Sequence, residues 1–421
     1  MKRIVCFGPG PRFKGGIANY NTALAKAFDK LADTQVHIVS WTQQYPAIIP
    51  RDFIDRSSKS DFLEGTDIQV TYLTNYNRPG SWKKTYEFIR DLKPDQVIFQ
   101  WAIALQGLPM GKIARRLKQH PEIEVIFDVH VLVQKEASVL DKFFTSYGLK
   151  YADTYIAHAY TTVNELKATL PHFEFVVNED GTRANGETRT IIKLYHPVYD
   201  LFSPNSNLDI KKLKAEMGLR QYVFLFFGFI RKYKGLHHVI PAFAKALEHR
   251  KDISLLIVGE SFWNTLDQTK WTTRIKNVLF GLAKKIFLRK SDDERNYHPL
   301  ALIDELGIAE YTEVINKFVP NEEVHRYFQV SDCILTYYLT ATPSGVESLA
   351  YNFELPVLAT RVGHFPESIQ EGYNGYLAEA EDIDSMAAQM LRFIDQPIPN
   401  EQVAKVAASM SWKNYAEAIL A

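Results

Sequence analysis

Short apolar segments alternate with amphipathic segments along most of the chain. In the first half, six runs rich in β-branched and aromatic residues predict strands, because polar residues or prolines bound them. These runs lie at 3–7, 36–40, 68–73, 96–101, 125–129 and 154–159. Helical spacing of apolar residues predicts helices between them, for example over 17–31 and 108–120. This order is typical of a parallel sheet that carries helices on both faces.

The alternation stops near the middle of the chain and then restarts. Residues 178–189 are polar and contain glycine, and 196–207 contain two prolines without periodicity, so both predict loops. Further apolar runs lie at 222–230, 253–260, 312–319, 332–338 and 355–360. Because 421 residues exceed one ordinary core, we predict two doubly wound, Rossmann-like α/β domains, at 1–197 and 208–408.

The end of the chain, 409–421, predicts one more helix. Its apolar face is formed by Trp412, Tyr415, Ala416 and Ile419. We expect this helix to pack back on the first domain.

The charge balance argues against some classes of partner. Lys plus Arg and Asp plus Glu both number 49, so no global positive field for nucleic acid is expected, and any anion site must be local. Cys6 and Cys333 match no metal or redox spacing, which indicates a reducing compartment. Neither an apolar run of about 18 residues nor a signal peptide is apparent. We therefore expect a cytoplasmic protein.

The first glycine-rich stretch is GPGPRFKGGIANY, residues 8–20, between a predicted strand and a predicted helix. Backbone N–H groups at such a helix start can hold a phosphate or a polar sugar group. Phe13 stands where the dinucleotide fingerprint needs a third glycine, which argues against a nicotinamide enzyme. The alternative is a plain turn that needs positive φ at Gly15 or Gly16.

A second glycine-containing turn, in 224–243, follows the first strand of the second domain and carries Arg231, Lys232 and Lys234. Cations beside a helix start favour a diphosphate, because side-chain charge and oriented N–H groups act on the same anion. The alternative is a solvated basic turn.

A third loop, Pro343 to Glu347, follows a later strand. Ser344 and Glu347 have the spacing of a capping box, and the amides of Gly345 and Val346 would then point outward at a helix start. Glu347 either caps this helix or contacts a substrate.

Four stretches together resemble the GT-B glycosyltransferases, specifically the retaining family 4 enzymes that use nucleotide sugars. They are GGIANY, FGFIRKYKG, SGVESLAYNFELPVLAT and VGHFPESIQEGYNGYL, which extend over nearly the whole chain. The resemblance implies two domains that face a cleft, with the nucleotide sugar mostly on the second domain and the acceptor mostly on the first. It also implies transfer of a hexose-type sugar to a glycan or lipid-linked acceptor in polysaccharide or glycoconjugate biosynthesis.

The resemblance assigns roles to particular residues. Arg231 and Lys234 would stabilise the leaving diphosphate, so that no metal or other cofactor is needed. Gly15 and Gly16 would close over the donor from the opposite domain. The donor would also contact the third loop, at Ser344, Gly345, Val346 and Glu347. His130 would orient a hydroxyl of the transferred sugar or steady an oxocarbenium-like transition state; alternatively, it is a satisfied histidine at a strand end.

Two positions depart from the family pattern. The two glutamates typical of the family would fall near Ala341 and Leu349, and neither residue is acidic. This departure keeps two alternatives open: a catalytically silent protein that binds nucleotide sugars, and a sugar-nucleotide epimerase, which shares the architecture.

An insertion at 261–298 contains a further amphipathic pattern. Over 271–290, apolar residues follow helical spacing and basic residues lie beside them. Such a helix either covers a core or lies on a membrane surface with anionic lipids. The second interpretation predicts a peripheral enzyme on the cytoplasmic membrane face.

Overall fold

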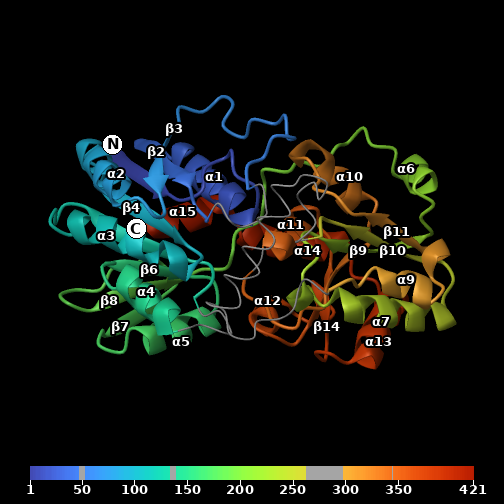
Figure 1. The fold of residues 1–421 in the computed structure, drawn as a ribbon. Coiled ribbons are helices and arrows are strands. Elements are labelled where there is room, and N and C mark those ends of the chain that lie inside the picture. The colour runs from blue at the N-terminus through green and yellow to red at the C-terminus, as the bar shows by residue number, and fades with distance from the viewer. Residues whose placement is uncertain (47–52, 133–138, 262–296, 344) are drawn as a thin grey trace.

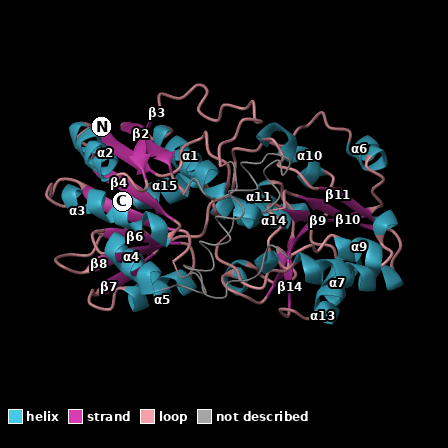
Figure 2. Ribbon diagram, in the orientation of Figure 1, coloured by secondary structure: helices cyan, strands magenta, loops and turns pink. Residues whose placement is uncertain are grey.

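The computed structural model describes residues 1–46, 53–132, 139–261, 297–343 and 345–421. Two α/β domains lie next to one another, the N-terminal domain on the left of Figure 1 and the C-terminal domain on the right. Each domain contains one parallel sheet with helices on its faces (Figure 2). The predicted fold class is therefore confirmed.

The first domain is built on an eight-stranded sheet. Its strands are β1 (Lys2–Phe7), β2 (Thr34–Gln43), β3 (Gln69–Asn75), β4 (Gln96–Trp101), β5 (Glu124–Val129), β6 (Thr154–Ala157), β7 (Phe175–Asn178) and β8 (Arg189–Lys193). Its helices are α1 (Gly16–Asp29), α2 (Pro79–Asp91), α3 (Gly107–Leu117), α4 (Val139–Leu149) and α5 (Tyr160–Thr169), with a short 3₁₀ helix, η1 (Ala104–Gln106). The strand order is β3-β2-β1-β4-β5-β6-β8-β7.

The second domain has a six-stranded sheet in the order β11-β10-β9-β12-β13-β14. The strands are β9 (Tyr222–Phe227), β10 (Ile253–Val258), β11 (Thr312–Ile315), β12 (Cys333–Thr336), β13 (Val357–Thr360) and β14 (Gly375–Ala378). Its helices are α6 (Ile210–Glu216), α7 (Leu236–His249), α9 (Ala301–Glu305), α10 (Val324–Gln329), α11 (Gly345–Asn352), α12 (Phe365–Ser368), α13 (Ile383–Asp395) and α14 (Asn400–Ser409), and α15 (Trp412–Leu420) ends the chain.

Both sheets reverse their winding at one point, between β1 and β4 in the first domain and between β9 and β12 in the second. At such a point the loops that follow the two strands diverge, which opens a crevice at the carboxyl edge of the sheet. The glycine-rich loops after β1 and β9 therefore lie where parallel α/β sheets usually bind ligands.

The last helix, α15, packs against α1 of the first domain. Figure 1 shows it among the elements of that domain. The carbonyl of Ile419 accepts hydrogen bonds from Gln96 (3.3 Å) and Arg183 (2.6 Å), and the carbonyl of Leu420 accepts one from Lys2 (2.6 Å). These bonds satisfy backbone groups that a helix end otherwise leaves open.

Within the described ranges, no helix has both the length and the apolar character needed to cross a membrane.

Candidate active site

The glycine-rich loops of the two domains line one cavity of about 270 Å³. Five of the residues expected at a donor site lie in its wall: Gly15, Gly16, Lys234, Gly345 and Val346. One contact from the segment that connects the domains, and one contact between the domains, close this region. The hydroxyl of Tyr199 donates to the carbonyl of Gly16 (2.7 Å), and the ammonium of Lys14 lies 4.5 Å from the ring centre of Phe318.

Gly228, directly after β9, makes room for Lys234 in this wall. Its φ of 96° is in the left-handed region, and a Cβ atom there would lie 2.7 Å from Lys234 Nζ. A side chain at position 228 would therefore be strained and would displace the lysine.

The Lys234 side chain is buried, and its Nζ donates a long hydrogen bond of 3.3 Å to the carbonyl of Phe227. Burial, together with the positive charge of Arg231, lowers the pKa of Lys234 to about 7. A bound anion would stabilise the ammonium form and so oppose this shift, and the lysine therefore favours a phosphate group in the cavity.

The other residues predicted at the donor are Arg231, Ser344 and Glu347, and neither Arg231 nor Glu347 lines the cavity. Arg231 packs its guanidinium 5.1 Å from the ring centre of Tyr233 and is not among the residues that line the cavity. It influences the cavity through its charge on Lys234. Ser344 lies outside the described residues, as does the predicted amphipathic segment 271–290.

Glu347, the third of these residues, is buried in α11 and does not line the large cavity. Its carboxylate accepts hydrogen bonds from His364 Nε2 (2.5 Å) and from the Tyr351 hydroxyl (3.1 Å). Burial alone would raise the pKa of Glu347, but the charge and hydrogen bond of His364 outweigh it and lower the pKa. The acid is thus held as a carboxylate by its neighbours within the domain.

Glu260 is a cavity residue that the sequence did not reveal. It follows β10 directly and lines the large cavity, and its Oε2 atom is buried without a hydrogen-bond partner among the described residues. Leu349, where the family resemblance places a glutamate, lines the same cavity. The signal available in the sequence was an acidic residue at the carboxyl end of a predicted strand.

His130 is buried and lines neither this cavity nor its neighbour. Its Nε2 donates to Oε1 of Gln100 at 2.7 Å. Burial lowers the pKa of His130 to about 4, although the charge of Asp128 opposes this shift, so the ring is neutral near pH 7. His130 therefore orients Gln100.

Gln100 in turn lines a second cavity, of about 180 Å³. The loop residues Lys14, Gly15 and Gly16 line both cavities, so the two spaces adjoin. The Gln100 Nε2 atom is buried and has no hydrogen-bond partner in the described part of the chain. An unpaired amide N–H group of this kind can donate a hydrogen bond to the oxygen of a hydroxyl group. A polar residue near the end of the apolar run 96–101 was the signal in the sequence.

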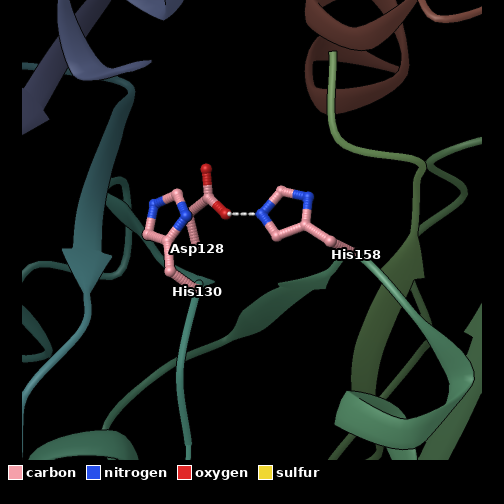
Figure 3. Close-up of side chains that lie close together, drawn as sticks. All are labelled: Asp128, His130 and His158. Atoms are coloured by element: carbon pink, nitrogen blue, oxygen red, sulfur yellow. Dashed lines mark hydrogen bonds and ion pairs between the residues drawn. The ribbon is translucent and has the colours of Figure 1, made fainter. Parts of the chain in front are cut away.

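Behind Gln100 lies a buried cluster of Asp128, His130 and His158 (Figure 3). One donor atom from each lies within 4.8 Å of the others, so these residues could hold a metal ion. Asp128 and His158 already share a hydrogen bond of 2.8 Å, which an ion would have to replace. The hydroxyl of Tyr415 lies 3.4 Å from the second Asp128 oxygen, so the cluster also fastens α15 to the sheet.

Fold and cavity together define a class of protein. Two parallel-sheet α/β domains, with a cavity between the glycine-rich loops at their carboxyl edges, have the architecture of GT-B glycosyltransferases. Residues 209–410, nearly the whole second domain, match the family model described as "Glycosyl transferases group 1".

Comparisons with known proteins agree with this class. Spore coat protein SA of Bacillus subtilis (strain 168) is 23% identical over 317 residues, which cover 72% of this chain and 73% of that protein. D-inositol 3-phosphate glycosyltransferase of Mycobacterium marinum is 31% identical over 249 residues, or 55% of this chain and 44% of that protein.

Solved structures share the fold. Anabaena Alr3699/HepE in complex with UDP-glucose superposes with a TM-score of 0.62 at 15% identity, covering 99% of this chain and 94% of that one. The family match and these similarities support a glycosyltransferase.

Proposed function

We propose that the protein transfers a hexose-type sugar from a nucleotide diphosphate sugar to a glycan or lipid-linked acceptor, with retention of anomeric configuration. One observation carries the proposal: the buried cation of Lys234 lines a cavity between glycine-rich loops of both domains. The UDP-glucose bound by the Anabaena neighbour supports the same class of donor for this chain.

The donor diphosphate would lie between Lys234 and the start of α11. The amides of Gly345 and Val346 are at the N-terminus of this eight-residue helix, where the helix dipole favours an anion. As the bond from the sugar to the phosphate breaks, negative charge grows on the leaving diphosphate, and Lys234 stabilises it. The charge of Arg231 assists from outside the cavity wall. In this scheme no metal or other cofactor takes part.

Glu260 would accept hydrogen bonds from hydroxyl groups of the donor. Its unpaired Oε2 lies in the same cavity as Leu349, so it can supply a carboxylate that the leucine cannot. The acceptor would enter the second cavity, where the Gln100 amide donates to one of its oxygens. Attack from the face of the departing diphosphate would let a phosphate oxygen take the acceptor proton.

A catalytically silent nucleotide-sugar-binding protein is the second candidate. The observation that favours it is the absence of a carboxylate at Leu349, together with the engagement of Glu347 by His364.

One experiment separates the two candidates. The purified chain is screened by thermal shift and isothermal titration against UDP-, GDP- and ADP-sugars, because a ligand that binds only the native state raises its midpoint. Donor hydrolysis and transfer to lipid-linked and soluble glycans are then measured with the donor that binds, and the anomeric configuration of the product is read by NMR. Binding with turnover supports the transferase. Tight binding without turnover supports the silent protein, and no binding of any nucleotide sugar refutes both.

A further inference from the structure

An exposed apolar stripe runs along α4. Val139, Leu140 and Phe143 are 85%, 60% and 58% exposed, and Phe143 stacks on Tyr147 one turn further along. Leu105 of η1, 39% exposed, belongs to an element that packs against α4. Large apolar side chains exposed together at helical spacing usually mark a contact surface. We call these four exposed residues the α4 stripe.

Basic residues flank the α4 stripe. The ranges 107–118 and 139–150, which form α3, α4 and the residue after each, contain six lysines and arginines and one acidic residue; one of the six, Lys118, forms an ion pair with Asp153 outside these ranges. The ammonium groups of Lys112 and Lys150 lie 5.9 and 5.1 Å from the ring centre of Tyr147. This balance differs from the chain as a whole, which is neutral. An apolar stripe edged by cations is complementary to an anionic lipid surface.

The helices that carry this surface, α3 and α4, are closely packed. A Cβ at Gly107 or Gly111 of α3 would collide with the backbone of Phe144 or the side chain of Tyr147, so the two helices approach closely. The apolar and basic side chains are therefore held on one face.

One residue of the α4 stripe, Leu105, is close to the second cavity, which we call the acceptor-side cavity. In the sequence, Leu105 lies between Ala102 and Gln106, and both of these residues line the same cavity as Gln100. A surface in contact with the stripe is therefore near the space where an acceptor would enter.

We propose that the face formed by α3, α4 and η1 docks on an anionic bilayer and brings the acceptor-side cavity to lipid-linked acceptors. The docking itself stands on the exposed side chains, whereas the delivery of the acceptor rests on the proposed function. This face is separate in sequence from the segment 271–290.

Liposome flotation of the full chain tests the docking. Vesicles of phosphatidylcholine alone are compared with vesicles containing phosphatidylglycerol, at low and high salt. We expect flotation with anionic vesicles that weakens as salt screens the charges. The double variant Leu140→Ser/Phe143→Ser should reduce the partition coefficient by about tenfold. Val176→Ser/Leu306→Ser, which changes exposed apolar residues elsewhere, is the matched control.

The charges are tested separately. Lys112→Ser/Lys150→Ser should weaken partitioning by about fivefold for each basic residue removed, while Lys211→Ser/Lys405→Ser should not. Circular dichroism and the midpoint of thermal unfolding without ligand confirm that each variant is folded. Failure of the wild-type chain to float with anionic vesicles, or wild-type flotation by the Leu140→Ser/Phe143→Ser variant, overturns the proposal. A chain that floats but binds no nucleotide sugar would refute the proposed function and leave this docking intact.

Discussion

Replacing Lys234 by methionine should make the folded protein more stable while it weakens donor binding. Lys234 is buried, and its pKa is lowered from 10.5 to about 7 by burial and by Arg231. The difference between these values, at about 1.4 kcal/mol per pH unit, corresponds to about 5 kcal/mol of folding free energy. Methionine has a similar length and carries no charge, so it removes this cost.

The sign and the pH range follow from proton binding. Between pH 7 and 10.5 the folded state holds fewer protons at this site than the unfolded state, so the free energy of unfolding rises with pH there. The cost of the buried ammonium is complete below pH 7 and is about 4 kcal/mol at pH 7 itself. The advantage of Lys234→Met should therefore be largest at and below neutral pH and should shrink toward pH 10.

Urea unfolding of wild type and variant at pH 7, 8 and 9, followed by tryptophan fluorescence, measures this difference. Comparing the two proteins at each pH cancels the titration of all other groups. Lys211→Met, at an exposed lysine of the same domain, should change stability little. A Lys234→Met protein that is no more stable than wild type at pH 7, or a difference that stays constant to pH 9, would refute the picture of a desolvated ammonium.

Three other predictions concern the cavities. Affinity for the nucleotide sugar should fall as pH rises from 7 to 9, by up to about tenfold per pH unit, because the free protein loses the Lys234 proton in this range. Titration calorimetry of wild type and Lys234→Arg at several pH values checks this prediction. Glu260→Gln should weaken donor binding by about tenfold, whereas the exposed Glu305→Gln should not. Gln100→Ala should reduce the rate of transfer to the acceptor by about tenfold and leave donor affinity unchanged. His130→Ala should have the same effect, because it removes the hydrogen bond that orients Gln100. Steady-state kinetics with varied acceptor concentration measures both effects.

Each of these has a contrary outcome. A pH profile of Lys234→Arg that follows wild type would assign the titration to another group. Equal donor affinity in Glu260→Gln and wild type would remove that carboxylate from the donor site. If His130→Ala impairs transfer while Gln100→Ala does not, the histidine acts other than through the glutamine.

The fold could be predicted from the sequence because buried parallel strands form continuous apolar runs. All six residues of β4 are buried, and its run was recognised at 96–101. The sequence does not predict β7 and β8, because these strands have only four and five residues, lie at one end of the sheet and lack a clear pattern. Their connecting loop, at 178–189, was recognised by its polar and glycine-rich composition.

The site was less accessible to sequence reasoning. Glycine-rich turns after strands indicated Gly15, Gly16 and Gly345, because such turns mark the carboxyl edge of a parallel sheet. Side-chain partners, however, depend on residues that only the fold brings close. Glu347 had the spacing of a cap, yet His364, from the loop before α12, holds its carboxylate. Glu260 cannot be assigned to the site from the sequence, because nothing in its neighbourhood along the chain shows that its carboxylate remains unpaired.

The return of α15 to the first domain means that the polypeptide passes between the domains twice. The two passages touch: the Val198 N–H donates to the carbonyl of Met410 at 3.0 Å. Two adjacent crossings can act as a hinge. They permit one domain to rotate relative to the other about the line of the crossings, but they resist sliding or separation of the domains. If the cavity opens by this rotation to admit a donor, the glycine-rich loops of the two domains would keep their alignment. They would form the same contacts when the cavity closes.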